Sequence, residues 1–400
     1  MLSIFLCLLL LLSPCSFALY TWTDLPDAIS TSSTQNDETK IDNPLSLESG
    51  SAILIEQNSG KILYEHNIHE PLRPASVTKI MSLILIMEAL DSGKITLETK
   101  VPCTEDAASM GGSQIWLDPR EELSVDEMLK AITIVSANDC VVAMADYLEG
   151  SQEAFVGKMN EKAKQLGMND TVFKNCHGID EDGHVTSSYD IALMSRELLT
   201  KHPSITNYTT IYMDSLREGK SQLVNTNKLI RTYNGATGLK TGSTSLALYN
   251  LSASATRDNL SLIAVIMKAP STKVRFAEAQ KLLDYGFSNY TYQEVAKQGE
   301  SVKTVEVDKG VKNCVEAIVE KNAGTLIKKG QEKEVVQSIQ IQDSISAPIE
   351  KGQKLGEITY TLQNEVIDRI DVVAKENIEK MTLWNRTKET LKEWFCLLRI

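Results

Sequence analysis

Apolar and polar residues alternate differently along the chain, and these changes predict its helices and strands. Residues 51–56 and 61–64 are strand-like runs around Asn58-Ser59-Gly60, a combination typical of a β-hairpin. Residues 80–90 are almost wholly apolar, which predicts a buried helix. Helical spacing recurs in four more segments, which are residues 125–148, 153–166, 187–201 and 273–285. A second hairpin is expected near residue 258, with strands at residues 246–255 and 260–267.

This order of elements predicts the α+β class. Strands come first, several helices follow, and strands and a helix close the region, which is typical of an antiparallel sheet with helices gathered against it. After about residue 292 short strand-like runs punctuated by glycine take over. We therefore expect one domain at residues 45–292 and a small all-β domain at residues 293–378.

The beginning of the chain predicts export. Residues 4–12 are apolar apart from Cys7, and Ser16-Phe17-Ala18 offers the small-x-small pattern of a cleavage site. We expect a signal peptide at residues 1–18 and a flexible lead-in, rich in Ser, Thr, Asp and Asn, at residues 19–44. A lipoprotein signal ending at Cys15 is the alternative, although Pro14 directly before that cysteine fits it poorly.

The end of the chain predicts an amphipathic helix. Residues 379–400 lack Gly and Pro, and aromatic and apolar residues recur among Lys and Arg. Tryptophan together with basic residues suits a helix lying in a membrane interface. We expect this segment to bind the outer face of the cytoplasmic membrane; a helix docked on the β domain is the alternative.

Composition and charge narrow the function. The chain has 400 residues, 42% hydrophobic and 24% charged, which excludes a disordered chain and a multi-span membrane protein. Its net charge of −12 argues against a nucleic-acid partner. Seven cysteines without CxxC spacing give no disulfide framework. The five histidines show no zinc-ligand spacing, so we expect neither a metal nor a cofactor.

Three short motifs carry candidate chemistry. Ser76-Val-Thr-Lys79 precedes the apolar helix, and positions i and i+3 share a helix face, so the lysine amine can reach the serine hydroxyl. A buried lysine loses solvation, its pKa falls, and it can accept a proton. Ser136-Ala-Asn138 could relay a proton and hold an amide. Lys240-Thr-Gly242 could bind a carboxylate, and its glycine allows a close approach of substrate backbone.

Each motif is common alone, but their order and setting resemble the active-site serine penicillin-recognising enzymes. The chain is similar to the low-molecular-weight penicillin-binding proteins, which are serine-type D-alanyl-D-alanine carboxypeptidases of peptidase family S11. The resemblance extends to residues 73–81, 108–114, 136–139, 175–178 and 237–242. It implies a penicillin-binding, β-lactamase-like catalytic domain, and the β domain and terminal anchor are family features too.

The resemblance also implies roles. Ser76 would be the acylated nucleophile, Lys79 the general base and Ser136 the proton relay to the leaving D-alanine. The substrate would be bound by Asn138, Lys240, Thr241, Gly242, Ser243 and Arg275. The implied partners are peptidoglycan stem peptides ending in D-Ala-D-Ala and β-lactam antibiotics, and the implied reaction removes the terminal D-alanine.

Three residues depart from the family pattern, and some alternative functions stay open. Ala137 stands where glycine is common, Ser243 where histidine or tyrosine is, and Cys176 where proline or alanine is. A class A β-lactamase fits poorly, because Glu161 lacks the setting of the deacylating glutamate. A DD-endopeptidase, and a non-catalytic protein that binds peptidoglycan or β-lactams, remain alternatives.

Overall fold

The computed structural model describes residues 45–382, 384 and 387. The expected signal peptide and lead-in, and most of the expected terminal helix, lie outside the described residues. Among the residues described, no helix is both long enough and apolar enough to cross a membrane.

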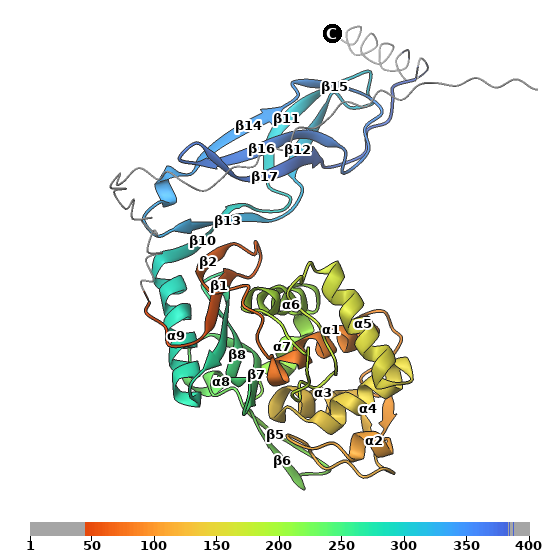
Figure 1. The fold of residues 1–400 in the computed structure, drawn as a ribbon. Coiled ribbons are helices and arrows are strands. Elements are labelled where there is room, and N and C mark those ends of the chain that lie inside the picture. The colour runs from red at the N-terminus through yellow and green to blue at the C-terminus, as the bar shows by residue number, and fades with distance from the viewer. Residues whose placement is uncertain (1–44, 383, 385–386, 388–400) are drawn as a thin grey trace, which may run out of the picture. The chain divides into compact units, whose positions relative to one another are not determined.

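A five-stranded antiparallel sheet forms the centre of the N-terminal domain (Figure 1). Its strand order is β2-β1-β9-β8-β7, so strands from both ends of the domain pair in the middle. The expected hairpins are confirmed by β1 with β2 and by β8 with β9. The strands are β1 (Ser51–Glu56), β2 (Ile62–His66), β7 (Ala236–Thr244), β8 (Leu248–Arg257) and β9 (Leu260–Ala269).

Both faces of this sheet are covered. Successive residues of β1 alternate between two apolar clusters, with Ile53 in the helical core and Leu54 in the cluster formed with the long last helix. That helix, α9 (Thr272–Asn289), packs on β8 and β9, whereas α6 (Ser188–Lys201) packs on β1 and β9 from the other side. Central strands buried on both faces read as continuous apolar runs for this reason.

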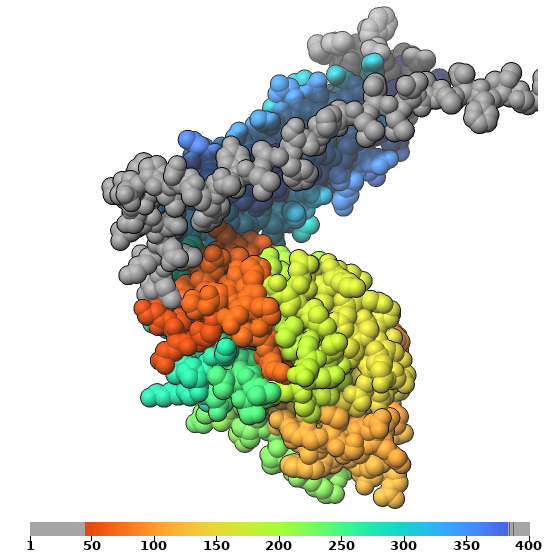
Figure 2. Space-filling model, in the orientation of Figure 1, coloured from red at the N-terminus to blue at the C-terminus, as the bar shows by residue number. Residues whose placement is uncertain are grey.

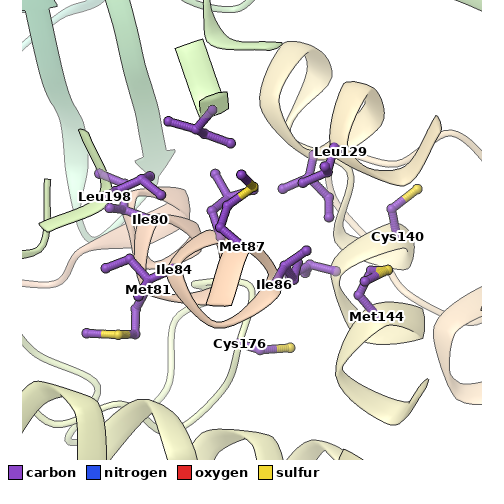
Figure 3. Packing of buried hydrophobic residues seen from close by; sticks show 14 of the residues in the cluster. Ile80, Met81, Ile84, Ile86, Met87, Leu129, Cys140, Met144, Cys176 and Leu198 are labelled. Carbon is purple, nitrogen blue, oxygen red and sulfur yellow. The ribbon is translucent and has the colours of Figure 1, made fainter. Parts of the chain in front are cut away.

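The remaining helices build a lobe around α1 (Lys79–Asp91), which is buried nearly all round (Figure 3). Its neighbours α4 (Asn138–Glu149) and α5 (Gln152–Gln165) pack against it. Ser151, Ser187 and Ser271 cap α5, α6 and α9 by accepting a hydrogen bond from a backbone N–H three residues on. The shorter helices are α2 (Glu105–Ala108), α3 (Val125–Lys130), α7 (Thr206–Thr209) and α8 (Leu229–Thr232).

The prediction of one helix over residues 125–148 is wrong. The segment begins as α3, widens into a π-helical turn at Ala131–Val135, and stops at Ser136, whose φ is +66°. The chain restarts as α4 at Asn138. Such breaks are frequent at functional sites, and this one places the Ser136-Ala-Asn138 motif on the corner between two helices.

Two small two-stranded sheets border this lobe, and the hydrophobic pattern did not predict them. They are β3 (Lys100–Pro102) with β4 (Glu122–Ser124), and β5 (Met213–Leu216) with β6 (Ser221–Val224). Their strands are only three or four residues long, too short for alternation to stand out.

The C-terminal part forms the expected all-β domain with an apolar core of its own. Its six-stranded sheet has the order β14-β16-β17-β12-β11-β15, and β10 pairs separately with β13. The strands are β10 (Tyr290–Ala296), β11 (Ser301–Asp308), β12 (Cys314–Val319), β13 (Ala323–Lys328), β14 (Val336–Ile341), β15 (Ser344–Ser346), β16 (Lys354–Leu362) and β17 (Glu365–Ala374).

Candidate active site

Ser76 lies on a short turn that precedes the buried helix. The turn is the 3₁₀ segment Ala75–Thr78, and it leads directly into α1. Ala75 has a φ of +51°, a left-handed conformation that costs energy for a residue with a side chain. Ser76 is partly exposed whereas Val77, Thr78 and Lys79 are buried. The fold therefore presents one hydroxyl to solvent at the beginning of a helix, where the helix dipole favours negative charge.

Lys79 is fully buried and lies against that hydroxyl. Its Nζ is 3.2 Å from Ser76 Oγ, and it donates to Asn138 Oδ1 and to the His177 carbonyl, each at 2.6 Å. Lys79 makes no ion pair with any residue in the described ranges. Burial lowers its pKa to about 7, against smaller opposing contributions from Cys176 and Asp139. A substantial share of the amine is thus neutral near pH 7.

A second serine–lysine pair faces this one. Lys240 Nζ on β7 donates to Ser136 Oγ at 2.8 Å and to the Thr241 carbonyl at 3.0 Å. Burial, together with the positive charges of Lys79 and Arg275, lowers the pKa of Lys240 well below its usual value. Two hydroxyls, each with a buried amine, thus meet at one site.

Asn138 connects the two pairs to a neighbouring loop. Its Oδ1 accepts from Lys79, while its Nδ2 donates to the Gly111 carbonyl and its backbone N–H to the Ser113 carbonyl, both at 2.7 Å. The following residue, Asp139, is fully buried and accepts hydrogen bonds from the same loop. The corner that carries Ser136 and Asn138 is therefore fixed on both sides.

Two glycines let backbone approach the Ser76 turn. A side chain on Gly242 would place its Cβ 2.9 Å from the backbone nitrogens of Ser76 and Val77. Gly178 has a φ of +92°, and a Cβ there would overlap the Ala75 carbonyl oxygen. The edge strand β7 and the 175–178 segment thus contact the turn through main chain alone.

The other predicted substrate-binding residues lie along or behind β7. Thr241 Oγ1 is 2.8 Å from Thr226 Oγ1, and Ser243 is exposed. Arg275 is only 6% exposed; its Nη1 donates to the carbonyls of Gly242 and Asn250 at 3.2 Å each, and its guanidinium lies over the Tyr249 and Phe276 rings. Burial lowers its pKa to about 10. In this structure Arg275 supports β7 and β8 from behind.

Comparison with known families decides what this site belongs to. Residues 37–271 match the model of the D-alanyl-D-alanine carboxypeptidase family, and residues 290–380 match that of the C-terminal domain of penicillin-binding protein 5. The chain belongs to the D-alanyl-D-alanine carboxypeptidase family. Family membership confirms the α+β catalytic domain followed by an all-β domain, and a serine-type DD-carboxypeptidase as the enzyme class.

Individual relatives cover most of the chain. It is 48% identical to the D-alanyl-D-alanine carboxypeptidase DacF of Bacillus subtilis, over 88% of this chain and 91% of that protein. It is 34% identical to DacC of Escherichia coli, over 88% and 90%. Penicillin-binding protein 5 from Haemophilus influenzae superposes with a TM-score of 0.71 at 30% identity, covering 84% of this chain and 98% of the other.

One solved relative carries a drug. Penicillin-binding protein D2 from Listeria monocytogenes, in its ampicillin-bound form, superposes with a TM-score of 0.56 at 30% identity, covering 61% of this chain and 99% of the other. The class A β-lactamase alternative finds no support in this family membership, and Glu161 lies exposed on α5, paired with Lys158.

Sequence reasoning missed several members of this carboxypeptidase site. Gly111 and His177 lie in segments that carry the resemblance, 108–114 and 175–178, but no role was expected of their main-chain carbonyls, since every residue has one. Asn250 is fully buried in β8, and its Nδ2 donates to the carbonyls of Arg73 and Pro74 just before the Ser76 turn. An amide within the otherwise strand-like run 246–255 is the signal that could have found it.

Proposed function

We propose that this chain is a DD-carboxypeptidase that removes the terminal D-alanine from peptidoglycan stem peptides through an acyl-enzyme on Ser76. The observation that carries the proposal is the environment of Lys79, a fully buried amine with a pKa of about 7 lying 3.2 Å from a partly exposed serine hydroxyl. An activated nucleophile needs a base of this kind, matched to the working pH.

Lys79 has the hydrogen-bond partners of a neutral base. A neutral amine has two N–H groups and one lone pair. Asn138 Oδ1 and the His177 carbonyl, each at 2.6 Å, accept the two N–H groups, which leaves the lone pair for the Ser76 hydroxyl proton. Ser76 Oγ would then attack the carbonyl of the penultimate D-alanine, while the backbone N–H groups of Ser76 and Ser243 stabilise the oxyanion.

The second pair would complete the transfer. Ser136, held by Lys240 at 2.8 Å, is placed to pass a proton to the leaving D-alanine nitrogen. Lys240, Thr241 and the buried positive charge of Arg275 favour an anionic carboxylate beside Gly242, which suits the free carboxylate of a terminal D-alanine. Water then hydrolyses the ester, and a β-lactam would acylate the same hydroxyl.

The cellular setting follows from the family and from the two ends of the chain. Enzymes that act on the cell wall work outside the cytoplasm, and we place this enzyme there. Within the proposal, residues 1–18 are a removable signal, residues 45–292 the catalytic domain and residues 293–378 the β domain. Residues 379–400 would hold the enzyme on the outer face of the membrane through their aromatic and basic side chains.

The direct test measures free D-alanine released from a stem pentapeptide by residues 45–378 and by the Ser76→Ala variant. We expect steady release by the wild type and a loss of at least about 1,000-fold in the variant, because the variant lacks the hydroxyl on which the acyl-enzyme forms. Release that persists in Ser76→Ala would contradict the assignment of the nucleophile. Cleavage of cross-linked dimers in place of pentapeptides would instead show an endopeptidase.

A further inference from the structure

Trp116 is the most exposed large apolar side chain in the described part of the N-terminal domain. It is 76% exposed, although Ile115 and Leu117 on either side are each only 4% exposed. Its φ is +53°, in the left-handed region that a bulky residue rarely adopts. The chain thus presents a large aromatic group to solvent between two buried residues, in a backbone conformation that costs energy.

The backbone around Trp116 is held from inside the protein. The N–H groups of Ile115 and Leu117 donate to Asp139 Oδ2 at 3.0 and 3.1 Å. Arg217 Nη1 donates to the Ile115 carbonyl at 2.9 Å, and Arg217 is itself paired with Glu121. A strained conformation persists only where its surroundings over-determine it, and such sites often serve function. These hydrogen bonds therefore hold Trp116 in its outward position.

This loop is joined to the proposed substrate-binding residue. Asn138 donates to the carbonyls of Gly111 and Ser113, and Trp116 follows Ser113 by three positions, at most about 11 Å along the chain. On the other side, the β5–β6 hairpin holds the loop through Arg217 and continues to Thr226, which contacts Thr241. Figure 2 shows the orange surface of this loop region beside the green surface of that hairpin.

The substrate itself indicates what meets this surface. Under the proposed function Asn138 holds the amide on the acyl side of the scissile bond, so the rest of the donor continues past its loop. In peptidoglycan about three further stem residues, spanning on the order of 10 Å, separate that point from the sugar. An indole offers a flat apolar face with one polar N–H, which suits the C–H face and hydroxyl rim of a pyranose.

We propose that Trp116 forms a subsite for a sugar ring of the glycan strand that carries the stem peptide. The inference rests on the proposed function for the direction of the donor. It makes Trp116 a residue that selects glycan-attached stems over free peptides.

The test compares two substrates that contain the same peptide. One is the free pentapeptide, and the other is that pentapeptide attached to its disaccharide. We expect Trp116→Ala to lower the ratio of kcat/KM for the disaccharide substrate over the free peptide about tenfold, mostly through KM. Trp116→Phe should restore most of the ratio. Tyr147→Ala is the matched control, since Tyr147 is a 42% exposed aromatic on α4, and it should leave the ratio unchanged.

Other outcomes overturn the inference. An equal fall on both substrates would show that Trp116 only supports the loop, and an unchanged ratio would show that no sugar is bound there. A wild type that releases no D-alanine from either substrate would overturn the proposed function alone. Calorimetric titration of both ligands into Ser76→Ala, with and without Trp116→Ala, would then decide: a sugar-dependent gain in affinity that needs Trp116 supports the subsite, and its absence refutes it.

Discussion

The interiors of the two domains are built from different kinds of residue. In the N-terminal domain, Lys79, Lys240, Asp139 and Glu56 are at most 1% exposed. In the described part of the β domain, only Thr325 among the polar side chains is buried. Its lysines pair at the surface instead, as Lys303 does with Asp343 at 2.7 Å.

This difference shows where the fold accepts an energetic penalty. Burying a charge without an opposite partner costs several kcal/mol, and apolar residues of the same volume would stabilise a fold better. The β domain follows that rule. The N-terminal domain breaks it at Lys79 and Lys240, the two amines of the candidate active site. Function, and not stability, explains these two lysines.

The claim that function explains the buried Lys79 is tested most directly by a variant that carries a positive charge there but cannot act as a base. An arginine stays protonated, so Lys79→Arg should slow acylation by a fluorescent penicillin about 1,000-fold, the scale of a lost general base. Rapid-mixing fluorescence checks the rate. Lys61→Arg, at an exposed position just before β2, is the matched control. Lys79→Met, with the melting temperature of each variant, separates lost chemistry from lost folding. Acylation within tenfold of wild type would refute the role of Lys79 as base.

The pH dependence of acylation should also reveal Lys79 as the base. Because burial lowers the pKa of Lys79 to about 7, the neutral fraction rises with pH and levels off above it. Acylation by a β-lactam whose carboxylate stays ionised over the whole range should increase roughly 30-fold from pH 5.5 to pH 8.5, which follows from that fraction. Stopped-flow rates across this range, with circular dichroism to show that the fold persists, provide the check. A flat profile would mean that Lys79 does not carry the proton.

The same substitution, glycine to alanine at a left-handed residue, can be made in each domain and its effects compared. Gly178→Ala would push the Ala75 carbonyl beside Ser76, so we expect a loss of about 2–4 kcal/mol in the free energy of unfolding and at least about tenfold in acylation. Gly352→Ala has the same left-handed strain at φ +86° but meets no atom within 4 Å. It should cost about 1 kcal/mol and leave acylation unchanged. Denaturant unfolding measures both, and similar losses would show that the Ser76 turn is less constrained than described.

Sequence patterns predicted most of this molecule where side chains decide the structure. The apolar run at 80–90 is α1, and the runs around Asn58-Ser59-Gly60 are the β1–β2 hairpin. The strand-like runs expected in the β domain were 302–307, 315–319, 335–341 and 357–362. They did not include β17, in which charged residues such as Glu365, Asp368 and Arg369 interrupt the apolar ones. The motif at Ser136 was expected between helices, as it is, but helical spacing on both sides of it gave no sign of where the helix breaks.

The candidate site likewise has one part that sequence motifs predicted and another that only the structure shows. The three motifs placed Ser76, Lys79, Ser136, Asn138 and Lys240 in one constellation, and the structure brings them together. One acceptor that orients Lys79, Asn138 Oδ1, belongs to a motif. The other is the main-chain carbonyl of His177, and left-handed residues such as Ala75 adopt their conformation because tertiary contacts impose it. Neither leaves a mark in the local sequence.

The main-chain walls around Ser76 also limit how such an enzyme could escape an inhibitor. Resistance by substitution needs a side chain that can change size or polarity near the drug. On the two walls nearest the nucleophile, Gly242 and Gly178 leave no room for any side chain. Substitutions that alter binding of the drug would therefore fall on other positions, such as the exposed Ser243 that follows Gly242 on β7.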